Sequence, residues 1–144
     1  MEISRRLATE SDKPFLWEAN RQAYRDVVMR QWGQWHDEIQ EGNFNEKWEQ
    51  ADFEIVEFAG EPIGAIWVTD EGEYFRLREL FLLPDHQGKG IGTQLVEQEL
   101  ARARRLHKPL RLRVLRENRA HVLYERLGFA VIDEEESTFW MEAV

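Results

Sequence analysis

Residues 80–92 read Leu80-Phe81-Leu82-Leu83-Pro84-Asp85-His86-Gln87-Gly88-Lys89-Gly90-Ile91-Gly92. The apolar run at the start of this stretch predicts a short strand that is covered on both faces. Pro84 has no N–H to donate, so we expect the strand to end there. After the glycines, apolar residues recur at helical spacing as far as Ala103 and predict an amphipathic helix. The stretch therefore predicts a strand, a glycine loop and the start of a helix.

The three glycines of this loop alternate with other residues. Because Gly88, Gly90 and Gly92 carry no Cβ, the backbone N–H groups between them are unshielded. A glycine loop that leads into a helix N-terminus gathers free N–H groups and the positive end of the helix dipole at one place. Lys89 adds a cation beside it. These residues predict a binding site for a pyrophosphate.

Three phosphate-loop patterns compete for this stretch. A P-loop requires GxxxxGK followed by Ser or Thr, which the chain lacks. A dinucleotide-binding fold requires GxGxxG directly after a strand, but here Gly92 comes one residue early and residues 84–87 separate the strand from the loop. The third pattern, Gln/Arg-x-x-Gly-x-Gly/Ala, fits Gln87, Gly90 and Gly92 at every fixed position. Together with the preceding strand and Pro84, the stretch resembles the acetyl-CoA motif of the GCN5-related N-acetyltransferases, the GNAT superfamily.

Residues 118–129 resemble a second signature of the same superfamily. They read Asn118-Arg119-Ala120-His121-Val122-Leu123-Tyr124-Glu125-Arg126-Leu127-Gly128-Phe129, and the core of the signature is Asn, then Ala, then Leu-Tyr-x-x-x-Gly-Phe. Only Arg119 separates Asn118 from Ala120, one residue fewer than in the commonest form of the signature, which implies a tighter loop. The close resemblance covers roughly residues 75–130, and before them only the order of strands and helices is similar.

Apolar alternation and turn signals predict strands near residues 3–9, 53–58, 63–69, 74–83, 110–115, 129–133 and 138–142. Helical spacing predicts helices near residues 14–28, 36–48, 91–106 and 120–127, the second interrupted near Gly42. The fold class is therefore α/β (α+β). The resemblance implies the GNAT fold in a single domain over residues 1–144: a mixed, mostly antiparallel sheet of six to seven strands with about four helices. It also implies that a bulge in the long strand splays the sheet at a central parallel pair.

The resemblance implies that acetyl-CoA is the co-substrate and that its pantetheine lies in the gap of the splayed sheet. Backbone groups around Phe81 and Leu82 would pair with the pantetheine amides, and backbone N–H groups from Gly88 to Thr93 would hold the pyrophosphate. We expect no metal, because His36 has no partner at a metal-ligand spacing. The residues expected to bind acetyl-CoA are Phe81, Leu82, Gln87, Gly88, Lys89, Gly90, Ile91, Gly92, Thr93, Asn118 and Tyr124.

The resemblance implies that Tyr124 lies near the coenzyme A sulfur and protonates the leaving thiolate. Packing as a core aromatic residue on a short helix is the alternative for this tyrosine. Because an amine with a pKa of about 10 is mostly protonated at pH 7, a base must take its proton before it attacks the thioester. Glu79 is the favoured base, since it lies on the strand that leads to the loop, and a strand N–H near Leu82 would stabilise the oxyanion. The rivals of Glu79 as base are Asp37, Glu38 and His36.

Residues 29–53 combine aromatic rings, an imidazole and carboxylates. One interpretation is an acceptor pocket, with apolar rings as walls and carboxylates that attract an amine. The other is that the aromatic residues pack a helical pair against the sheet, and the two interpretations are compatible. The residues expected to bind the acceptor are Trp32, Trp35, His36, Asp37 and Glu38.

Composition excludes several other classes of protein. The 144 residues contain no cysteine, which rules out disulfides, thiolate metal sites and a cysteine nucleophile. No apolar run approaches the ~20 residues of a membrane span, and the first residues have no signal-peptide core, so we expect a cytoplasmic protein. The net charge of −9 argues against nucleic acid as the main partner. Residues 76–126 nevertheless carry 12 Lys/Arg against 6 Asp/Glu, which favours an anionic ligand there and a cationic acceptor elsewhere.

The favoured function is an acetyl-CoA-dependent N-acetyltransferase that moves an acetyl group directly to a primary amine of a small molecule. One alternative is transfer to a peptide or protein amine, which would need a groove in place of a covered pocket. A third possibility is a non-enzymatic sensor that binds acyl-CoA without turnover. A homodimer could form through strands near the C-terminus, where Phe139, Trp140 and Met141 cluster.

Overall fold

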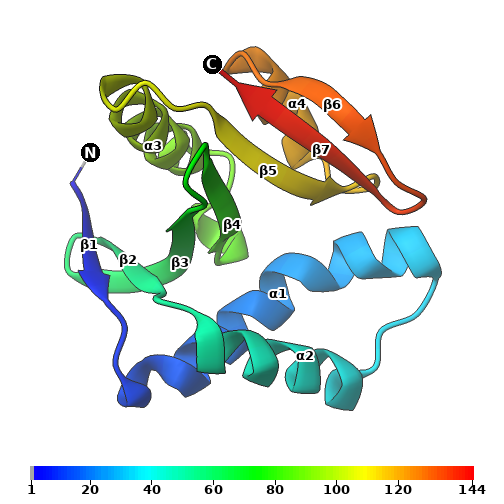
Figure 1. Cartoon of the computed structure of the whole chain (residues 1–144). Coiled ribbons are helices and arrows are strands. Elements are labelled where there is room, and N and C mark those ends of the chain that lie inside the picture. The colour runs from blue at the N-terminus through cyan, green and yellow to red at the C-terminus, as the bar shows by residue number, and fades with distance from the viewer. Residues whose placement is uncertain (1) are drawn as a thin grey trace.

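The computed structural model describes residues 2–144. They form a seven-stranded sheet of order β1-β2-β3-β4-β5-β7-β6 with four α-helices, which confirms the expected fold (Figure 1). No helix in the described part of the chain is both long and apolar enough to cross a bilayer. The elements are β1 (Ile3–Leu7), η1 (Glu10–Asp12), α1 (Lys13–Trp32), α2 (Asp37–Gln50), β2 (Glu54–Phe58), β3 (Glu61–Asp70), β4 (Phe75–Leu82), η2 (Pro84–His86), α3 (Ile91–Arg105), β5 (Leu110–Leu115), α4 (Ala120–Arg126), β6 (Ala130–Glu134) and β7 (Thr138–Ala143).

The helices cover the two faces of the sheet as two separate pairs. One apolar core joins α3 and α4 to the sheet and includes Leu95 and Tyr124. The other joins α1 and α2 to the opposite face and includes Leu16, Phe44 and Phe81. In Figure 1, α1 and α2 lie together below the sheet, whereas α3 and α4 lie at its upper side. The sheet is therefore the central layer between two helical layers.

The second helix differs from the sequence prediction, because α2 runs without interruption through Gly42. A Cβ at Gly42 would meet no atom within 4 Å, so this glycine is on the open side of the helix. A glycine inside a helix costs only about 1 kcal/mol. Packing offsets that cost, since the Phe44 ring lies 6.1 Å from Phe53 and 6.3 Å from Trp48. Tertiary contacts therefore override the local glycine signal.

A bulge in β4 decides which side chains share a face. Trp67 of β3 pairs with Glu79 and Val68 pairs with Leu77, so Arg78 is an extra residue in β4. Leu77 belongs to the core under α3 and α4, whereas Trp67 belongs to the core under α1 and α2. The bulge thus moves Glu79 to the α1–α2 face, and sequence alternation alone does not settle that orientation.

The sheet opens between its two parallel strands. β4 and β5 pair only from Phe75–Leu110 to Leu77–Leu112 among the described residues. Beyond the bulge, β4 continues to Leu82 along β3 but no longer pairs with β5. Figure 1 shows the two strands diverging, with α1 passing across the divergence. The splayed parallel pair expected from the sequence is therefore present.

Residues Phe139, Trp140 and Met141 lie on β7, which is flanked by β5 and β6. Met141 is fully buried in the core, and Trp140 is covered in part by Arg76. The exposed edge at this end of the sheet belongs to β6 instead. The apolar cluster at the C-terminus is thus explained by an inner strand, and homodimerisation stays a prediction.

Candidate active site

The glycine loop holds backbone conformations that other residues rarely adopt. Gly88 has φ of 73° and Gly90 has φ of 84°, both in the left-handed region. Gly90 caps α3, and the first helical bond of that end runs from the Gln94 N–H to the Gly90 carbonyl at 3.0 Å. The N–H groups of the three residues between them have no partner within the helix. This end of α3 is therefore built as a set of outward N–H donors, as the sequence predicts.

The side chain of Gln87 ties the loop to the end of β4. Its Nε2 donates to the Leu82 carbonyl at 2.9 Å. Gly92 lies against α4, since a Cβ there would sit 3.8 Å from Leu123 Cδ2. Lys89 is exposed beside the loop. The loop, the end of β4 and α4 are thus brought together at one end of the opening.

The backbone of β4 offers alternate residues to the opening. A Cβ at Gly64 would lie 2.1 Å from the Phe81 carbonyl oxygen, so that oxygen points toward β3. The carbonyls of Leu80 and Leu82 instead accept hydrogen bonds from Tyr24 and Gln87, so they point away from β3. The geometry therefore favours Leu80 and Leu82 as the residues whose backbone lines the opening, and Phe81 contributes its ring to the core under α1.

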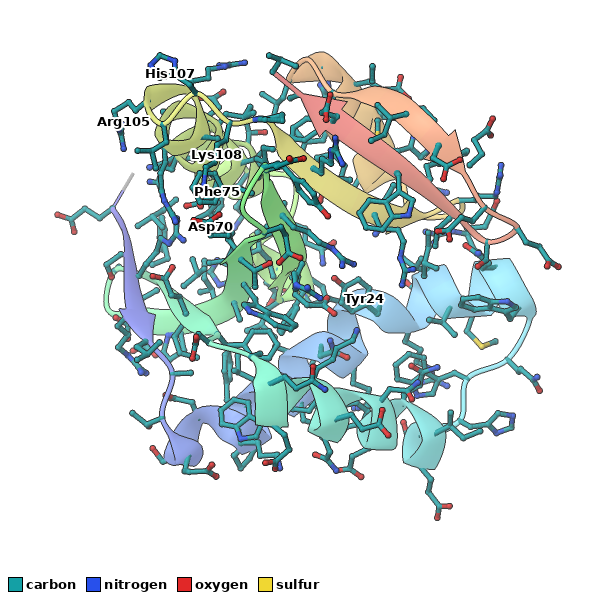
Figure 2. All side chains as sticks on the ribbon, viewed as in Figure 1. Tyr24, Asp70, Phe75, Arg105, His107 and Lys108 are labelled. Carbon is teal, nitrogen blue, oxygen red and sulfur yellow. The ribbon has the colours of Figure 1, made fainter. Side chains whose placement is uncertain are left out.

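Glu79 lies at the centre of a polar cluster on the α1–α2 face. Its side chain is 9% exposed, and one carboxylate oxygen is ion-paired with Lys47 of α2. The Tyr24 hydroxyl donates to the other oxygen at 3.2 Å and lies equally close to the Leu80 carbonyl. Figure 2 shows Tyr24 on the side of α1 that faces the strands. One carboxylate thus links β4 to both N-terminal helices.

Tyr124 of α4 is buried and lies within electrostatic reach of Glu79. Burial and then the negative charge of Glu79 raise the pKa of Tyr124 to about 12. The same two causes raise the pKa of Tyr24, to which the neighbouring Tyr124 also contributes. Both phenols are therefore neutral at pH 7. The charge of Glu79 therefore acts on Tyr124, the other residue that the sequence singles out as catalytic.

Comparison with known proteins is consistent with this arrangement. Residues 49–131 match the model of the acetyltransferase (GNAT) domain family, which is more than half of the chain. The chain belongs to the GNAT acetyltransferase family. The uncharacterized N-acetyltransferase MJ1207 of Methanocaldococcus jannaschii is 33% identical over 86 residues, a match that covers 54% of this chain and only 38% of that relative.

Solved GNAT structures share the whole fold at low sequence identity. The PaiA N-acetyltransferase of Thermoplasma acidophilum, solved in complex with coenzyme A, aligns with a TM-score of 0.81 at 24% identity over 99% of both chains. An acetyltransferase of Thermus thermophilus aligns with a TM-score of 0.75 at 19% identity over 99% of this chain and 96% of its own. At these identities the likeness establishes the fold.

The second GNAT signature holds its asparagine in a local turn. Asn118 Oδ1 accepts a hydrogen bond from the Ala120 N–H at 2.9 Å, so the side chain closes a turn immediately before α4. The Asn118 N–H donates to the Leu115 carbonyl at 3.0 Å and fixes the turn after β5. The oxygen of this side chain is thus engaged by the chain itself. The shortened spacing of the signature is accommodated by this tight turn.

The α1–α2 connection forms two adjoining surface hollows. One of about 390 Å³ is lined by Trp35, His36, Asp37, Glu38 and Ile39. The other, of about 180 Å³, is lined by Val28, Trp32, Gln34, His36, Ile39 and Gln40. These hollows bring together all five residues expected to bind the acceptor. Their described lining comes from the two helices and their connection, and does not include β4 or α4.

The aromatic residues of this region divide into two groups. Phe44, Trp48 and Phe53 stack within the core, as the packing interpretation predicts. Trp32 is 52% exposed, and the Trp35 indole N–H donates to Asp37 Oδ1 at 2.6 Å at the surface. The packing interpretation therefore holds for the first group, and only the second remains available to a ligand.

Sequence reasoning missed Tyr24 and Lys47 as members of the site. Tyr24 lies among apolar residues of α1, and the centroid of its ring is 6.0 Å from that of Phe81. The signal that could have found it is a hydroxyl on an otherwise apolar stripe, because a buried phenol needs a hydrogen-bond partner. Lys47 carries no such signal, since its pairing with Glu79 depends on how α2 docks.

Proposed function

We propose that this chain is an acetyl-CoA-dependent N-acetyltransferase that moves an acetyl group directly to a primary amine, and that residues 1–144 form one such domain. The observation that carries the proposal is the loss of pairing between β4 and β5 after Leu77, on the stretch of β4 that carries Glu79 and ends just before the glycine loop. Membership of the GNAT family and the coenzyme A complex of the Thermoplasma acidophilum relative support it.

The residues around the opening suit the three parts of acetyl-CoA. The N–H groups of Ile91, Gly92 and Thr93 and the positive end of α3 suit the pyrophosphate, with Lys89 as a nearby cation. The backbone N–H groups of Leu80 and Leu82 suit the pantetheine carbonyls, because β4 is not paired with β5 at these residues. The carbonyls of the same two residues already accept hydrogen bonds from Tyr24 and Gln87. Bound acetyl-CoA would supply the activated thioester. A backbone N–H of β4 near Leu82 would then stabilise the negative charge that develops on the thioester oxygen.

Glu79 is proposed as the group that takes the proton of the attacking amine. It is a carboxylate on the strand that lines the opening, and Lys47 and Tyr24 fix its two oxygens. Such double anchoring holds the carboxylate in one orientation, which general-base catalysis requires. The amine proton could reach Glu79 through the Tyr24 hydroxyl or through a water molecule. The rival bases are His36, which caps α2, and Asp37 and Glu38 in its first turn, and none of the three belongs to this cluster.

Tyr124 is proposed as the hydrogen-bond donor to the departing sulfur. With a pKa raised to about 12, it would transfer its proton to a thiolate of thiol pKa about 8.5 only at a cost of roughly 5 kcal/mol. That cost falls once Glu79 has accepted the amine proton, because the negative charge that raises the Tyr124 pKa is then neutralised. Uptake of the amine proton therefore makes Tyr124 a better acid at the moment when the sulfur leaves.

The acceptor is proposed to be a small-molecule amine that reaches the opening from the side of the α1–α2 connection. The hollows there combine the exposed indole of Trp32 and the half-buried indole of Trp35 with Asp37 and Glu38, which suit an amine. A peptide or protein amine remains the alternative acceptor, and a non-enzymatic acyl-CoA sensor the alternative function. The sensor predicts acetyl-CoA binding without amine-dependent turnover and no functional change in Tyr124→Phe.

The test is the release of coenzyme A from acetyl-CoA with the purified chain and separate panels of small amines and short peptides. Amine-dependent release that falls in Tyr124→Phe, with acetyl-CoA binding retained, supports the transferase. Faster turnover of peptides than of small amines would shift the acceptor to peptide or protein amines. Binding without release from any amine would support the sensor. Absence of acetyl-CoA binding would overturn the proposal.

A further inference from the structure

Three arginines and a tryptophan gather where β4, β5 and β7 lie side by side in the sheet (Figure 1). We call Arg76, Arg78, Arg113 and Trp140 the Arg76 cluster. Arg113 lies opposite Trp140 in the β5–β7 ladder. The guanidinium carbons of Arg76 and Arg113 lie 4.7 and 5.8 Å from the centroid of the Trp140 ring. Two cations therefore share one aromatic ring on this face.

Arg76 differs from its neighbours in lacking a carboxylate partner. Its Nε is buried and has no hydrogen-bond partner among residues 2–144. The neighbouring arginines each have a carboxylate partner, at different distances, so the missing partner is specific to Arg76. The distance from a guanidinium nitrogen to the partner carboxylate oxygen is 3.4 Å for Arg78 and Glu71. It is 3.8 Å for Arg113 and Glu135. It is 2.7 Å for Arg111 and Glu142.

The electrostatic environment of Arg76 is unfavourable in the free protein. Burial lowers the pKa of Arg76, the positive charges of Arg78 and Arg113 lower it further, and the negative charge of Glu71 offsets only part of this effect. A guanidinium nevertheless keeps its charge at neutral pH. A buried donor that is left unpaired is costly, and its planar N–H groups match the oxygens of a carboxylate or phosphate. An oxyanion at this place would relieve both the missing hydrogen bond and the repulsion between the cations.

The bulge in β4 places this cluster on the same face as the proposed general base. Arg78 is the extra residue, and its guanidinium carbon lies 5.2 Å from the centroid of the Trp67 ring, which is opposite Glu79. Arg76 precedes Glu79 by three residues, or about 10 Å of strand. A ligand of moderate length could therefore contact Arg76 and Glu79 together.

We propose that the Arg76 cluster binds an oxyanion group of the acceptor, so that the acceptor is an amine that carries a carboxylate or a phosphate several bonds from its nitrogen. This inference rests on the proposed N-acetyltransferase function. The amine end meets Glu79, and the anionic end meets Arg76 and Arg113. The cluster then selects zwitterionic amines over plain alkylamines and diamines.

The first experiment compares acceptors of matched length by coenzyme A release at constant ionic strength. Pentylamine, 5-aminopentanoate and cadaverine differ only in the group at the far end, and 4-aminobutyl phosphate distinguishes a phosphate from a carboxylate. We expect kcat/KM for an anionic acceptor to exceed that for pentylamine by about 10- to 100-fold, the range of a hydrogen bond to a charged group. Cadaverine should be the poorest acceptor. Equal kcat/KM for all four acceptors would overturn the proposal.

Variants localise the effect. Arg76→Gln should reduce the preference for the anionic acceptor over pentylamine to about one, through KM more than kcat. Arg113→Gln should reduce this preference in part. Because Arg113 is exposed, this variant replaces Arg76→Gln as the test if Arg76→Gln does not fold. Arg105→Gln removes the same charge from the exposed end of α3, where Figure 2 labels it, and should leave the preference unchanged. An unchanged preference in both Arg76→Gln and Arg113→Gln would contradict the assignment.

A second measurement does not depend on turnover. Pentanoate, which has no amine, is titrated into the ¹⁵N-labelled chain while the Nε–H signal of Arg76 and the indole signal of Trp140 are followed by NMR. Both signals should shift, and the Trp140 shift should vanish in Arg76→Gln. If no amine is acetylated, the proposed function fails while this titration still decides the oxyanion site. If neither signal moves with pentanoate or with phosphate, the oxyanion site is wrong whatever the enzyme acetylates.

Discussion

Glu79 of β4 lies opposite Trp67 of β3, although Leu77, two residues earlier, packs on the other face of the sheet. The extra residue Arg78 accounts for this reversal. It places the carboxylate under α1 and α2, where Tyr24 and Lys47 contact it. The pairing of β4 with β5 ends at Leu77, so the reversal and the opening of the sheet occur at the same point of the strand. One irregularity therefore both creates the opening and supplies it with a carboxylate.

Replacing Glu79 by glutamine should abolish most of the activity. The amide keeps the size of the side chain but does not accept the amine proton, so kcat/KM should fall by about 10²- to 10⁴-fold. The substitution also removes the negative charge that helps to raise the pKa of Tyr124, so that pKa should fall below about 12. Ultraviolet titration of the tyrosines in Glu79→Gln measures the shift in the pKa of Tyr124. The same titration of Tyr24→Phe separates the signal of Tyr124 from that of Tyr24. An unchanged tyrosine titration would show that the two groups are not coupled.

Replacing Tyr124 by phenylalanine should slow the transfer but leave acetyl-CoA binding intact. The lost hydroxyl removes the donor to the sulfur, for which we expect a fall in kcat of about 100-fold or more. Tyr74→Phe is the matched control, because Tyr74 lies against Arg111 and outside the proposed site. In the native chain Tyr124 stays protonated until pH approaches about 12, so the rate should show no descending limb from this group between pH 7 and 10. Full activity of Tyr124→Phe would leave this residue as a core aromatic only.

Replacing Gly64 by alanine should destabilise the fold, because the new Cβ would lie 2.1 Å from the Phe81 carbonyl oxygen. Since that neighbour is backbone, relief requires β3 and β4 to separate, and we expect a loss of about 1–3 kcal/mol or more in the free energy of unfolding. Gly42→Ala is the opposite control, since it adds a Cβ in open space inside α2 and should stabilise by about 0.5–1 kcal/mol. Urea unfolding of both variants measures the difference. Equal stability of the two variants would contradict the close approach of β3 and β4.

Gly90 and Gly92, the second and third glycines of the loop, should respond differently to alanine. Gly90 has φ of 84°, so Gly90→Ala should cost about 1–2 kcal/mol of stability. A Cβ at Gly92 would make an ordinary contact with Leu123, so Gly92→Ala should change stability little. Acetyl-CoA affinity should fall in Gly90→Ala, because the N-terminal N–H groups of α3 would turn away. Calorimetric titration beside thermal unfolding separates the two effects, and undiminished affinity in Gly90→Ala would speak against a phosphate site at this loop.

The Arg6–Asp12 pair should contribute to stability in a pH-dependent way. Hydrogen bonds from Arg6 and from the Thr9 N–H hold the pKa of Asp12 well below its ordinary value of 3.8. Because the folded-state pKa is lowered, the contribution is fully present above about pH 4 and is lost as the pH falls through the lowered pKa. The free energy of unfolding should therefore drop more between pH 5 and 2 in the native chain than in Asp12→Asn. Parallel pH dependence of the two proteins would rule out this contribution.

Much of this fold could be predicted because its signals are local. Strand alternation, the glycine loop and the apolar spacing of α3 are each read within a few residues, and the structure places them as expected. The interruption at Gly42 was wrong because tertiary packing of Phe44 outweighs a small local cost. Local sequence patterns do not predict the features that depend on contacts between segments far apart in the chain.

The site itself was only partly predictable. Tyr124 could be named from the second GNAT signature and Glu79 from its place on a strand. The face on which Glu79 lies depends on the bulge at Arg78, and the alternation of apolar and polar residues in the sequence does not reveal that bulge. The contact of Lys47 with Glu79 joins residues far apart in the chain, and it depends on the docking of α2. Sequence could not predict that the buried Nε of Arg76 has no hydrogen-bond partner among the described residues, because this depends on how its neighbours pair across the sheet.

We propose that bound acetyl-CoA lies in the opening between β4 and β5 and reaches the N-terminus of α3. The most direct test is an NMR titration of the ¹⁵N-labelled chain with acetyl-CoA, following backbone amides. We predict that the amides of Leu80 and Leu82 and those of residues 88–93 shift and gain protection from exchange, while Leu110 and Leu112, which are already paired in the sheet, change little. Tight binding without changes at β4 and the glycine loop, or no binding at all, would contradict the account.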